Sequence, residues 1–179
     1  MKSFDVPSRE QAKPESQLLF DTLQKRLGKV PNLYAAMSYS AHALKGFMDF
    51  EDEINHGVFT AKEREAVALV VSEVNKCEYC LAGHTAAALK RGFTKDEIIA
   101  IRKGEVPDRR LNAIIKLAKS MAENEGRAEE SMLIRFYMAG FLEAGVIELI
   151  GLVTIRIFTN YVFALTQVPI DFPEVEPLS

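Results

Sequence analysis

Residues Glu65 to His84 read EAVALVVSEVNKCEYCLAGH, and their pattern gives the clearest indication of how the chain folds. The first ten residues of this stretch are mostly apolar or small and contain no turn signal, which predicts a buried helix. The pattern changes at residues 75–76 (Asn-Lys), where we expect a turn into a second helix. That second helix carries Cys77 and Cys80, followed four residues later by His84. The stretch therefore predicts a helical hairpin with two cysteines at its turn.

Helix start and stop signals frame this hairpin on both sides. Thr60 to Glu63 and Thr94 to Glu97 both have the capping-box spacing, in which a hydroxyl and a carboxylate satisfy the first free amides of a helix. Gly92 and Gly104 follow helical stretches and are typical helix stops. Strand-like alternation is nearly absent from the chain. We therefore predict an all-α fold with a redox core at about residues 60–104.

Outward from this core, the same signals predict N-terminal helices within residues 14–57 and a second helical repeat within residues 108–167. Helices are expected to begin near Pro14, Pro31, Ser40 and Asp108, and the last two to occupy about Glu129 to Ala139 and Gly145 to Gln167. The sequence from Gly92 echoes the sequence from Gly140 at an offset of 48 residues, as duplicated helical hairpins would. At this offset the second copy has no cysteine. We predict one helical domain over residues 1–179.

Composition excludes several classes of function. The formal net charge is -3 and the pI is about 5.7, whereas nucleic-acid or anionic-membrane surfaces need clustered basic residues. The apolar stretch from Ala139 to Leu165 is interrupted by three charged residues, which favours buried helices over a membrane span. Met1 to Lys13 lacks a signal-peptide pattern, so we expect a cytoplasmic protein. Two cysteines in a reducing compartment indicate redox or metal chemistry.

The spacing of the reactive residues has a direct chemical meaning. Both sulfurs are expected in the first turn of a helix, where free amides favour the thiolate, and two intervening residues allow a disulfide. His84 shares a helical face with Cys80, so an imidazole is near that sulfur. Glu65, on the preceding helix, is the acidic candidate to orient His84, and Glu73 is the competing one. Proximity to His84 favours Cys80 as the nucleophile, whereas the helix-terminus argument favours Cys77.

The run Glu65, Cys77-x-x-Cys80 and His84 resembles the signature of the alkyl hydroperoxidase D and carboxymuconolactone decarboxylase superfamily, and more narrowly its uncharacterised peroxidase-related branch. The resemblance extends over most of the chain, including residues 30–32 (Val-Pro-Asn) and 158–160 (Phe-Thr-Asn). It implies an alkyl hydroperoxidase D-like helical bundle, homo-oligomers such as trimers or hexamers, and reduction of hydrogen or organic peroxides. A thiol or dithiol protein would then reduce the enzyme again.

The resemblance also assigns roles to the four residues. Cys80 corresponds to the thiol that attacks peroxide, Cys77 to the resolving thiol, and His84 with Glu65 to the proton relay. This chain has Tyr79 where the best-known members have a second histidine between the cysteines. A phenol of ordinary pKa cannot shuttle protons at neutral pH, although its hydroxyl can orient a peroxide or water. Tyr79 in place of histidine is therefore expected to affect the rate of peroxide reduction. The decarboxylase members of the superfamily lack the cysteine pair, so its presence disfavours lactone decarboxylation.

Other interpretations remain open at the level of the sequence. Cys77, Cys80 and His84 could be three zinc ligands with Glu65 or water as the fourth, but no second ligand pair is present, so we expect no metal and no cofactor. The redox alternative is a protein disulfide reductase or electron-relay adaptor. A further alternative is a non-catalytic helical oligomer that senses oxidants or binds a ligand. Asn160 is expected to make a buried hydrogen bond, and Arg91 to lie on a solvated helix face.

Overall fold

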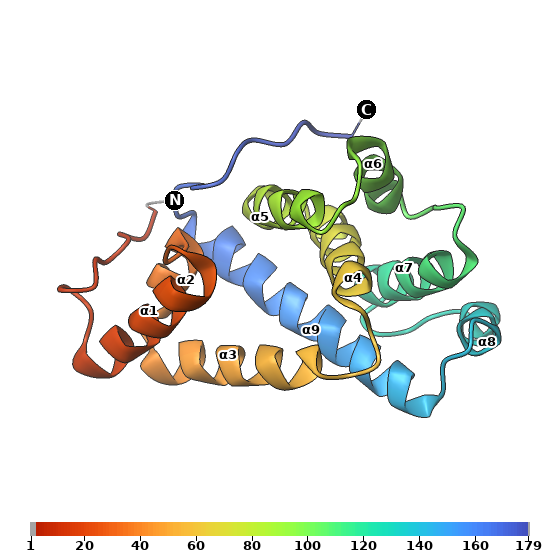
Figure 1. The fold of residues 1–179 in the computed structure, drawn as a ribbon, viewed down its shortest axis with the longest axis horizontal. Helices are drawn as coiled ribbons and strands as arrows, with labels where there is room; N and C mark the ends of the chain where they lie inside the picture. Colours follow the sequence, from red (N-terminus) through yellow and green to blue (C-terminus); the bar gives the residue numbers. More distant parts are fainter. Residues whose placement is uncertain (1–2, 179) are drawn as a thin grey trace.

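The computed structural model describes residues 3–178, and every regular element in this part of the chain is a helix. The all-α prediction is confirmed, and the helices form one bundle (Figure 1). Their bounds are α1 Pro14–Leu27, α2 Asn32–Met37, α3 Ala41–Asn55, α4 Ala61–Val74, α5 Glu78–Lys90, α6 Lys95–Lys103, α7 Arg109–Glu123, α8 Glu130–Met138 and α9 Glu143–Thr166.

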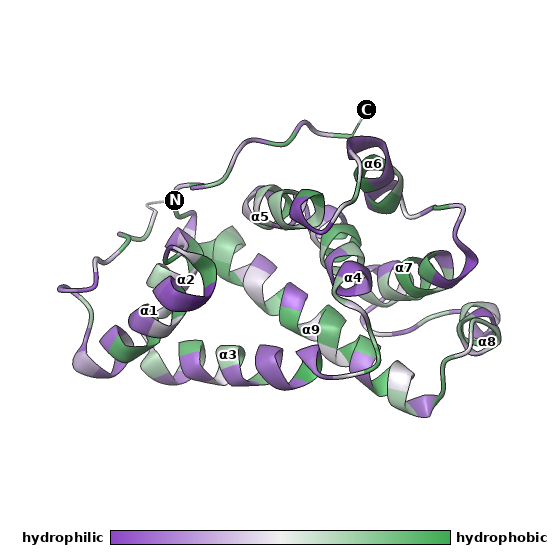
Figure 2. Ribbon diagram, in the orientation of Figure 1, coloured by the Kyte–Doolittle hydropathy of each residue, from purple (hydrophilic) through white to green (hydrophobic). Residues whose placement is uncertain are grey.

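Helix α4 forms the centre of the bundle and packs against α5, α6, α7 and α9. Its residues 66–71 are at most 1% exposed, because the helix has neighbours on all sides. This explains why the stretch in the sequence is uniformly apolar rather than amphipathic. By contrast, α3 at the edge of the bundle has purple and green faces in Figure 2, and only its Leu44, Phe47 and Met48 are buried.

The repeat expected from the sequence is present in the helices. α4 and α7 begin 48 residues apart, and so do α6 and α9. The side chain of Thr60 caps α4 and that of Asp108 caps α7. Lys62 lies over the ring of Phe93, and 48 residues later Arg110 lies over the ring of Phe141. The same contact between a cation and an aromatic ring is thus present at the corresponding place in both copies of the repeat.

The two copies differ where the cysteines lie. α5 begins at Glu78, whereas α8 begins at Glu130, four residues later in the register of the repeat. The second copy therefore lacks one helical turn, the turn that contains the C-x-x-C motif in the first copy. The prediction that α9 begins at Gly145 was wrong by two residues: the helix begins at Glu143, after Leu142 in an extended conformation.

Helix α9 crosses the bundle and joins its two halves, since it contacts α2, α3, α4, α5 and α7 (Figure 1). It is long and apolar enough to cross a membrane by length and composition, and half of its most apolar window is buried inside the fold. Its buried face includes polar residues, Arg156, Thr159 and Asn160. These properties are those of a helix in the core of the fold.

Candidate functional site

The turn between α4 and α5 places the cysteine pair. Lys76 adopts a left-handed conformation, with φ of 52°, and the amide of Cys77 then donates to the carbonyl of Ser72 at 2.9 Å. Cys77 becomes the N-cap of α5, and its Sγ accepts the amide of Cys80 at 3.4 Å. The residues Cys77 and Cys80 are 2% and 4% exposed, and both are free thiols. The sulfurs therefore lie next to one another beneath the surface.

The surroundings make the two thiols unequal. The neighbouring Cys80, together with burial, raises the pKa of Cys77 far above its usual range. The pKa of Cys80 is lowered to about 7, because hydrogen bonding with Cys77 and the charge of His84 outweigh the effect of burial. These surroundings favour Cys80 as the nucleophile over Cys77, the residue that the position at the helix terminus favours. The more acidic sulfur is that of Cys80, on the same helical face as His84.

A carboxylate holds the imidazole of His84. Nδ1 of His84 lies 2.8 Å from Oε2 of Glu65, and Nε of Arg91 donates to Oε1 of Glu65 at 3.0 Å. Burial raises the pKa of Glu65, but the hydrogen bond from His84 and the charges of His84 and Arg156 lower it to about 2. Glu65 is thus ionised, with both oxygens engaged. Since Nδ1 is taken, Nε2 is the ring nitrogen left for proton transfer.

Glu73, the competing carboxylate, has a different role. Its Oε2 lies 2.7 Å from Nε of Arg102, a residue of α6 that is 4% exposed. Glu73 therefore anchors α6 and does not face His84. Between the two acidic candidates, the geometry selects Glu65.

Helix α9 supplies two polar groups near the cysteine pair, of which the sequence analysis singled out Asn160 but not Thr159. Oγ1 of Thr159 lies 4.0 Å from Sγ of Cys80. Asn160 is 1% exposed, donates to Oγ of Ser72 at 3.3 Å and accepts from Nδ2 of Asn75 at 2.9 Å. The buried hydrogen bonding expected for Asn160 is present. Thr159 and Asn160 also help to lower the pKa of Cys80.

Arg156, one turn before Thr159 on α9, is a buried cation close to this site. It is 6% exposed, and its Nη2 donates to Oε1 of Glu51 at 2.9 Å. Its Nε is buried and has no partner among the described residues. Its signal in the sequence is a single arginine among the buried positions of a largely apolar helix, where the sequence analysis took it only as evidence against a membrane span. Such a residue is a functional candidate on burial grounds as well.

The contacts of Tyr79 and Arg91 differ from those expected from the sequence. The hydroxyl of Tyr79 accepts the amide of Leu33 at 3.1 Å and donates to Oδ1 of Asp171 at 2.5 Å, so it is not available to orient a peroxide. Burial, together with the hydrogen bond to Asp171, raises the pKa of Tyr79. Arg91 is partly exposed, but it binds Glu65 and is not simply solvated. A long-range partner of this kind leaves no signal in local spacing.

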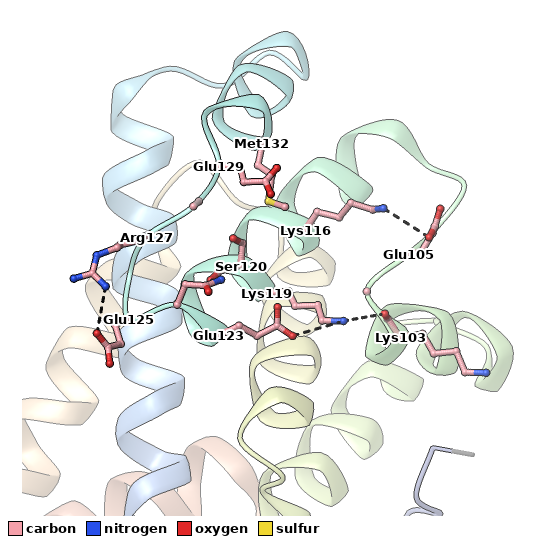
Figure 3. A pocket seen from close by; sticks show the side chains of 13 residues that line it. Lys103, Glu105, Lys116, Lys119, Ser120, Glu123, Glu125, Arg127, Glu129 and Met132 are labelled. Atoms are coloured by element: carbon pink, nitrogen blue, oxygen red, sulfur yellow. Dashed lines mark hydrogen bonds and ion pairs between the residues drawn. The ribbon is translucent and has the colours of Figure 1, made fainter.

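A hollow lies away from the sulfurs, at the second copy of the repeat. It measures about 900 Å³ and is lined by lysines and glutamates of α6, α7 and the α7–α8 connection (Figure 3). Glu125, Ala128 and Met132 line it, and at the 48-residue offset they correspond to Cys77, Cys80 and His84. The hollow thus lies where α8 lacks the turn that α5 possesses. Among the described residues, no three His, Cys, Asp or Glu side chains are grouped to hold a metal ion.

Comparison with known families gives one match. The sequence model of the Carboxymuconolactone decarboxylase family (CMD) matches residues 41–123, which span α3 to α7 and include the cysteine pair. No protein of curated function matches the sequence.

Solved structures share the whole fold. An uncharacterized peroxidase-related protein from Silicibacter sp. TM1040 has a TM-score of 0.79 and 26% sequence identity, over 94% of this chain and 91% of the other. The alkylhydroperoxidase AhpD core of a peroxidase-related protein from Ralstonia eutropha JMP134 has a TM-score of 0.82 and 17% identity, over 94% and 92%. A variant of the debrominase Bmp8 in complex with 2,3,4-tribromopyrrole has a TM-score of 0.80 and 16% identity, over 95% and 94%.

Proposed function

The chain belongs to the superfamily of alkyl hydroperoxidase D and carboxymuconolactone decarboxylase, and we propose that within it this protein is a thiol-dependent peroxidase. The observation that carries the proposal is the asymmetric setting of the cysteine pair: the sulfur of Cys77 accepts the amide of Cys80, and Glu65 holds the imidazole of His84 on the helical face of Cys80. This setting lowers the pKa of Cys80 to about 7 and raises that of Cys77, so at neutral pH about half of Cys80 is a nucleophilic thiolate while Cys77 is a thiol. The Glu65–His84 pair lies on the side of Cys80.

The reaction balances over two steps. The Cys80 thiolate attacks the terminal oxygen of a hydroperoxide, the O–O bond breaks, and a proton delivered through Nε2 of His84 gives the alcohol and a sulfenic acid. Cys77 then attacks the Cys80 sulfur, releasing water and forming the disulfide. The thiolate charge that raises the pKa of Cys77 no longer exists at this stage, so Cys77 becomes easier to deprotonate when it must react. Two electrons from a thiol or dithiol protein restore the pair.

Burial favours this proposal over the adaptor alternative. An adaptor must bring its sulfurs into contact with a disulfide of another protein, whereas Cys77 and Cys80 are almost fully buried. The side chain of His84, in contrast, is 21% exposed and offers a path for a small molecule. We accordingly propose a small peroxide as substrate and a reducing cytoplasm as the location.

The test is steady-state consumption of hydrogen peroxide and cumene hydroperoxide by the full chain, with dithiothreitol as electron donor. The matched control is the double variant Cys77→Ser/Cys80→Ser. We expect turnover only in the chain with both cysteines. Fast exchange with protein disulfides but no peroxide consumption would support the adaptor, and the absence of both reactions would support the non-catalytic oligomer.

A thiolate that attacks electrophilic oxygen can also attack halogen, and a debrominase shares the fold. The assay therefore includes 2,3,4-tribromopyrrole as a second substrate, with release of bromide as the measurement. Bromide release faster than peroxide consumption at equal concentrations would overturn the peroxidase proposal.

A further inference from the structure

The chain continues after α9 as an extended segment, residues 167–178, which returns across the bundle. In Figure 1 it leaves the end of α9, passes α5 and finishes beside α6. It contains no helix. Near its end, Nη1 of Arg102 donates to the carbonyl of Glu176 at 3.0 Å. We call residues 167–178 the C-terminal strap.

The strap is fastened at Asp171. The hydroxyl of Tyr79, between the two cysteines in sequence, donates to Oδ1 of Asp171 at 2.5 Å. Nζ of Lys29 lies 2.8 Å from Oδ2 of the same carboxylate and 2.6 Å from the Asp171 carbonyl. One carboxylate thus joins the strap both to the N-terminal region and to the first turn of α5.

On either side of Asp171 the strap packs over the redox turn. Val168 is 2% exposed and belongs to the apolar cluster that contains both cysteines. The ring of Phe172 meets that of Tyr79 edge-on, with centroids 5.5 Å apart. A Cβ atom at Gly83 would lie 3.5 Å from the Phe172 ring, which shows how closely the strap lies against α5. The strap is therefore part of the cover that buries the sulfurs.

This cover creates a problem for the second half of the proposed cycle. A small peroxide needs only a narrow path, but a protein dithiol must touch a sulfur of the disulfide to reduce it. At 2% and 4% exposure, neither sulfur can be touched by another protein.

We propose that the C-terminal strap is a redox-responsive cover, fastened by Tyr79 and Asp171 while the cysteines are reduced and released once they form a disulfide, so that a protein dithiol gains access to that disulfide. The inference rests on the proposed function, because it concerns the regeneration of the same cysteine pair.

The first turn of α5 couples disulfide formation to release of the strap. In the reduced state the Cys77 sulfur accepts the Cys80 amide. Oxidation removes two hydrogens from the pair, which pass to the peroxide to give alcohol and water, and the Cys77 sulfur must turn toward that of Cys80. Tyr79 lies within this turn, and hydrogen bonds weaken steeply with changes in distance and angle. Once the phenol moves, the side chain of Asp171 keeps the ion pair with the partly exposed Lys29 and the amide of Asn32, 3.4 Å from Oδ1. An exposed ion pair contributes little, so the remaining contacts hold the strap less firmly.

The experiment compares the full chain reduced with dithiothreitol and oxidised with diamide, a thiol oxidant that requires no peroxidase activity. Limited digestion with a glutamate-specific endoproteinase reports exposure of the Glu174–Val175 bond, and cleavage follows the population of the open strap. We expect cleavage after Glu174 about tenfold to a hundredfold faster in the oxidised chain, the range that follows from losing one charge-assisted hydrogen bond. Equal cleavage in both states overturns the inference.

Two variants locate the fastening. Asp171→Asn and Tyr79→Phe are expected to open the strap in both states, and to speed disulfide reduction by thioredoxin more than reduction by dithiothreitol. Tyr79→Phe retains the packed ring, so it tests the hydroxyl without creating a cavity. Glu176→Gln is the matched control, because it removes the same charge from an exposed position in the strap and keeps the cleavage site at Glu174. If Asp171→Asn and Tyr79→Phe both behave like Glu176→Gln, the fastening is wrongly assigned.

Failure here is distinguishable from failure of the proposed function. If the chain consumes no peroxide but its cleavage depends on the redox state, the inference about the strap is supported and the peroxidase proposal is wrong. If the chain consumes peroxide and its cleavage is the same in both redox states, the peroxidase proposal is supported and the inference about the strap is wrong.

Discussion

The backbone amide of Cys80 donates to the sulfur of Cys77 at 3.4 Å, so the two cysteines of the pair are chemically different. Cys77 is the helix cap and is buried against apolar groups of α2 and α9. Cys80, one turn further along, is near Thr159 and the charge of His84. This difference predicts which sulfur reacts first.

Replacing each cysteine by serine should therefore give different results. Cys80→Ser removes the acidic sulfur, and we expect peroxide consumption to fall below detection because a serine hydroxyl does not reduce peroxide. Cys77→Ser should permit one reaction and then accumulate a sulfenic acid on Cys80. Mass spectrometry after dimedone labelling measures this product. Dimedone labelling of Cys77 in Cys80→Ser would reverse the assignment.

The pH dependence of thiol reactivity follows from the lowered pKa of Cys80. A lowered pKa keeps the thiolate present at lower pH, so alkylation by iodoacetamide should rise as pH increases through about 7 and level off above it. Because Cys77 is the largest cause of the lowering, Cys77→Ala should move the midpoint upward, toward the ordinary value near ~8.5. Stopped-flow rates across pH 5–10 (roughly the range in which cysteines titrate) measure both midpoints. Identical midpoints in the two proteins would contradict the mechanism.

Glu65→Gln tests the positioning of the imidazole. Glutamine retains the size of the side chain but loses the charge that orients His84, and we expect kcat/KM for peroxide to fall roughly 100-fold, the lower end of what acid–base catalysis contributes. The pH profile should also change shape, which a purely structural role would not produce. Glu73→Gln is the control: it removes the same charge from the same helix, where Glu73 pairs with Arg102. Equal losses in the two variants would argue against the relay.

Arg156→Met tests the buried ion pair of α9. The substitution leaves the Glu51 carboxylate, 13% exposed, with only the longer contact to Arg26 at 3.2 Å. Breaking a buried pair from one side costs about 3 kcal/mol of unfolding free energy. Urea denaturation measures the loss, and Arg156→Met/Glu51→Gln should recover much of it, because no buried charge is then unpaired. A double variant as unstable as the sum of the single variants would show that the pair is not coupled.

Local chemistry let the sequence predict most of the architecture. The hydroxyls of Thr60 and Thr94 and the carboxylate of Asp108 satisfy helix amides within three residues, so the starts of α4, α6 and α7 were readable without tertiary information. The start of α9 was not, because Leu142 makes no side-chain cap.

Local sequence patterns are enough to predict the helical class and the grouping of Cys77, Cys80 and His84, because both depend on contacts within one or two helical turns, and the 48-residue repeat is visible directly. Three contacts follow only from the packing of the helices: Glu65 rather than Glu73 meets His84, Arg91 binds Glu65, and Tyr79 donates to Asp171, 92 residues away. Spacing along one helix determines which side chains share a face of that helix. Contacts between helices depend in addition on how each helix is rotated about its own axis against its neighbours. The difference in pKa between Cys77 and Cys80 also depends on contacts between helices, since it requires groups from α4, α5 and α9 together.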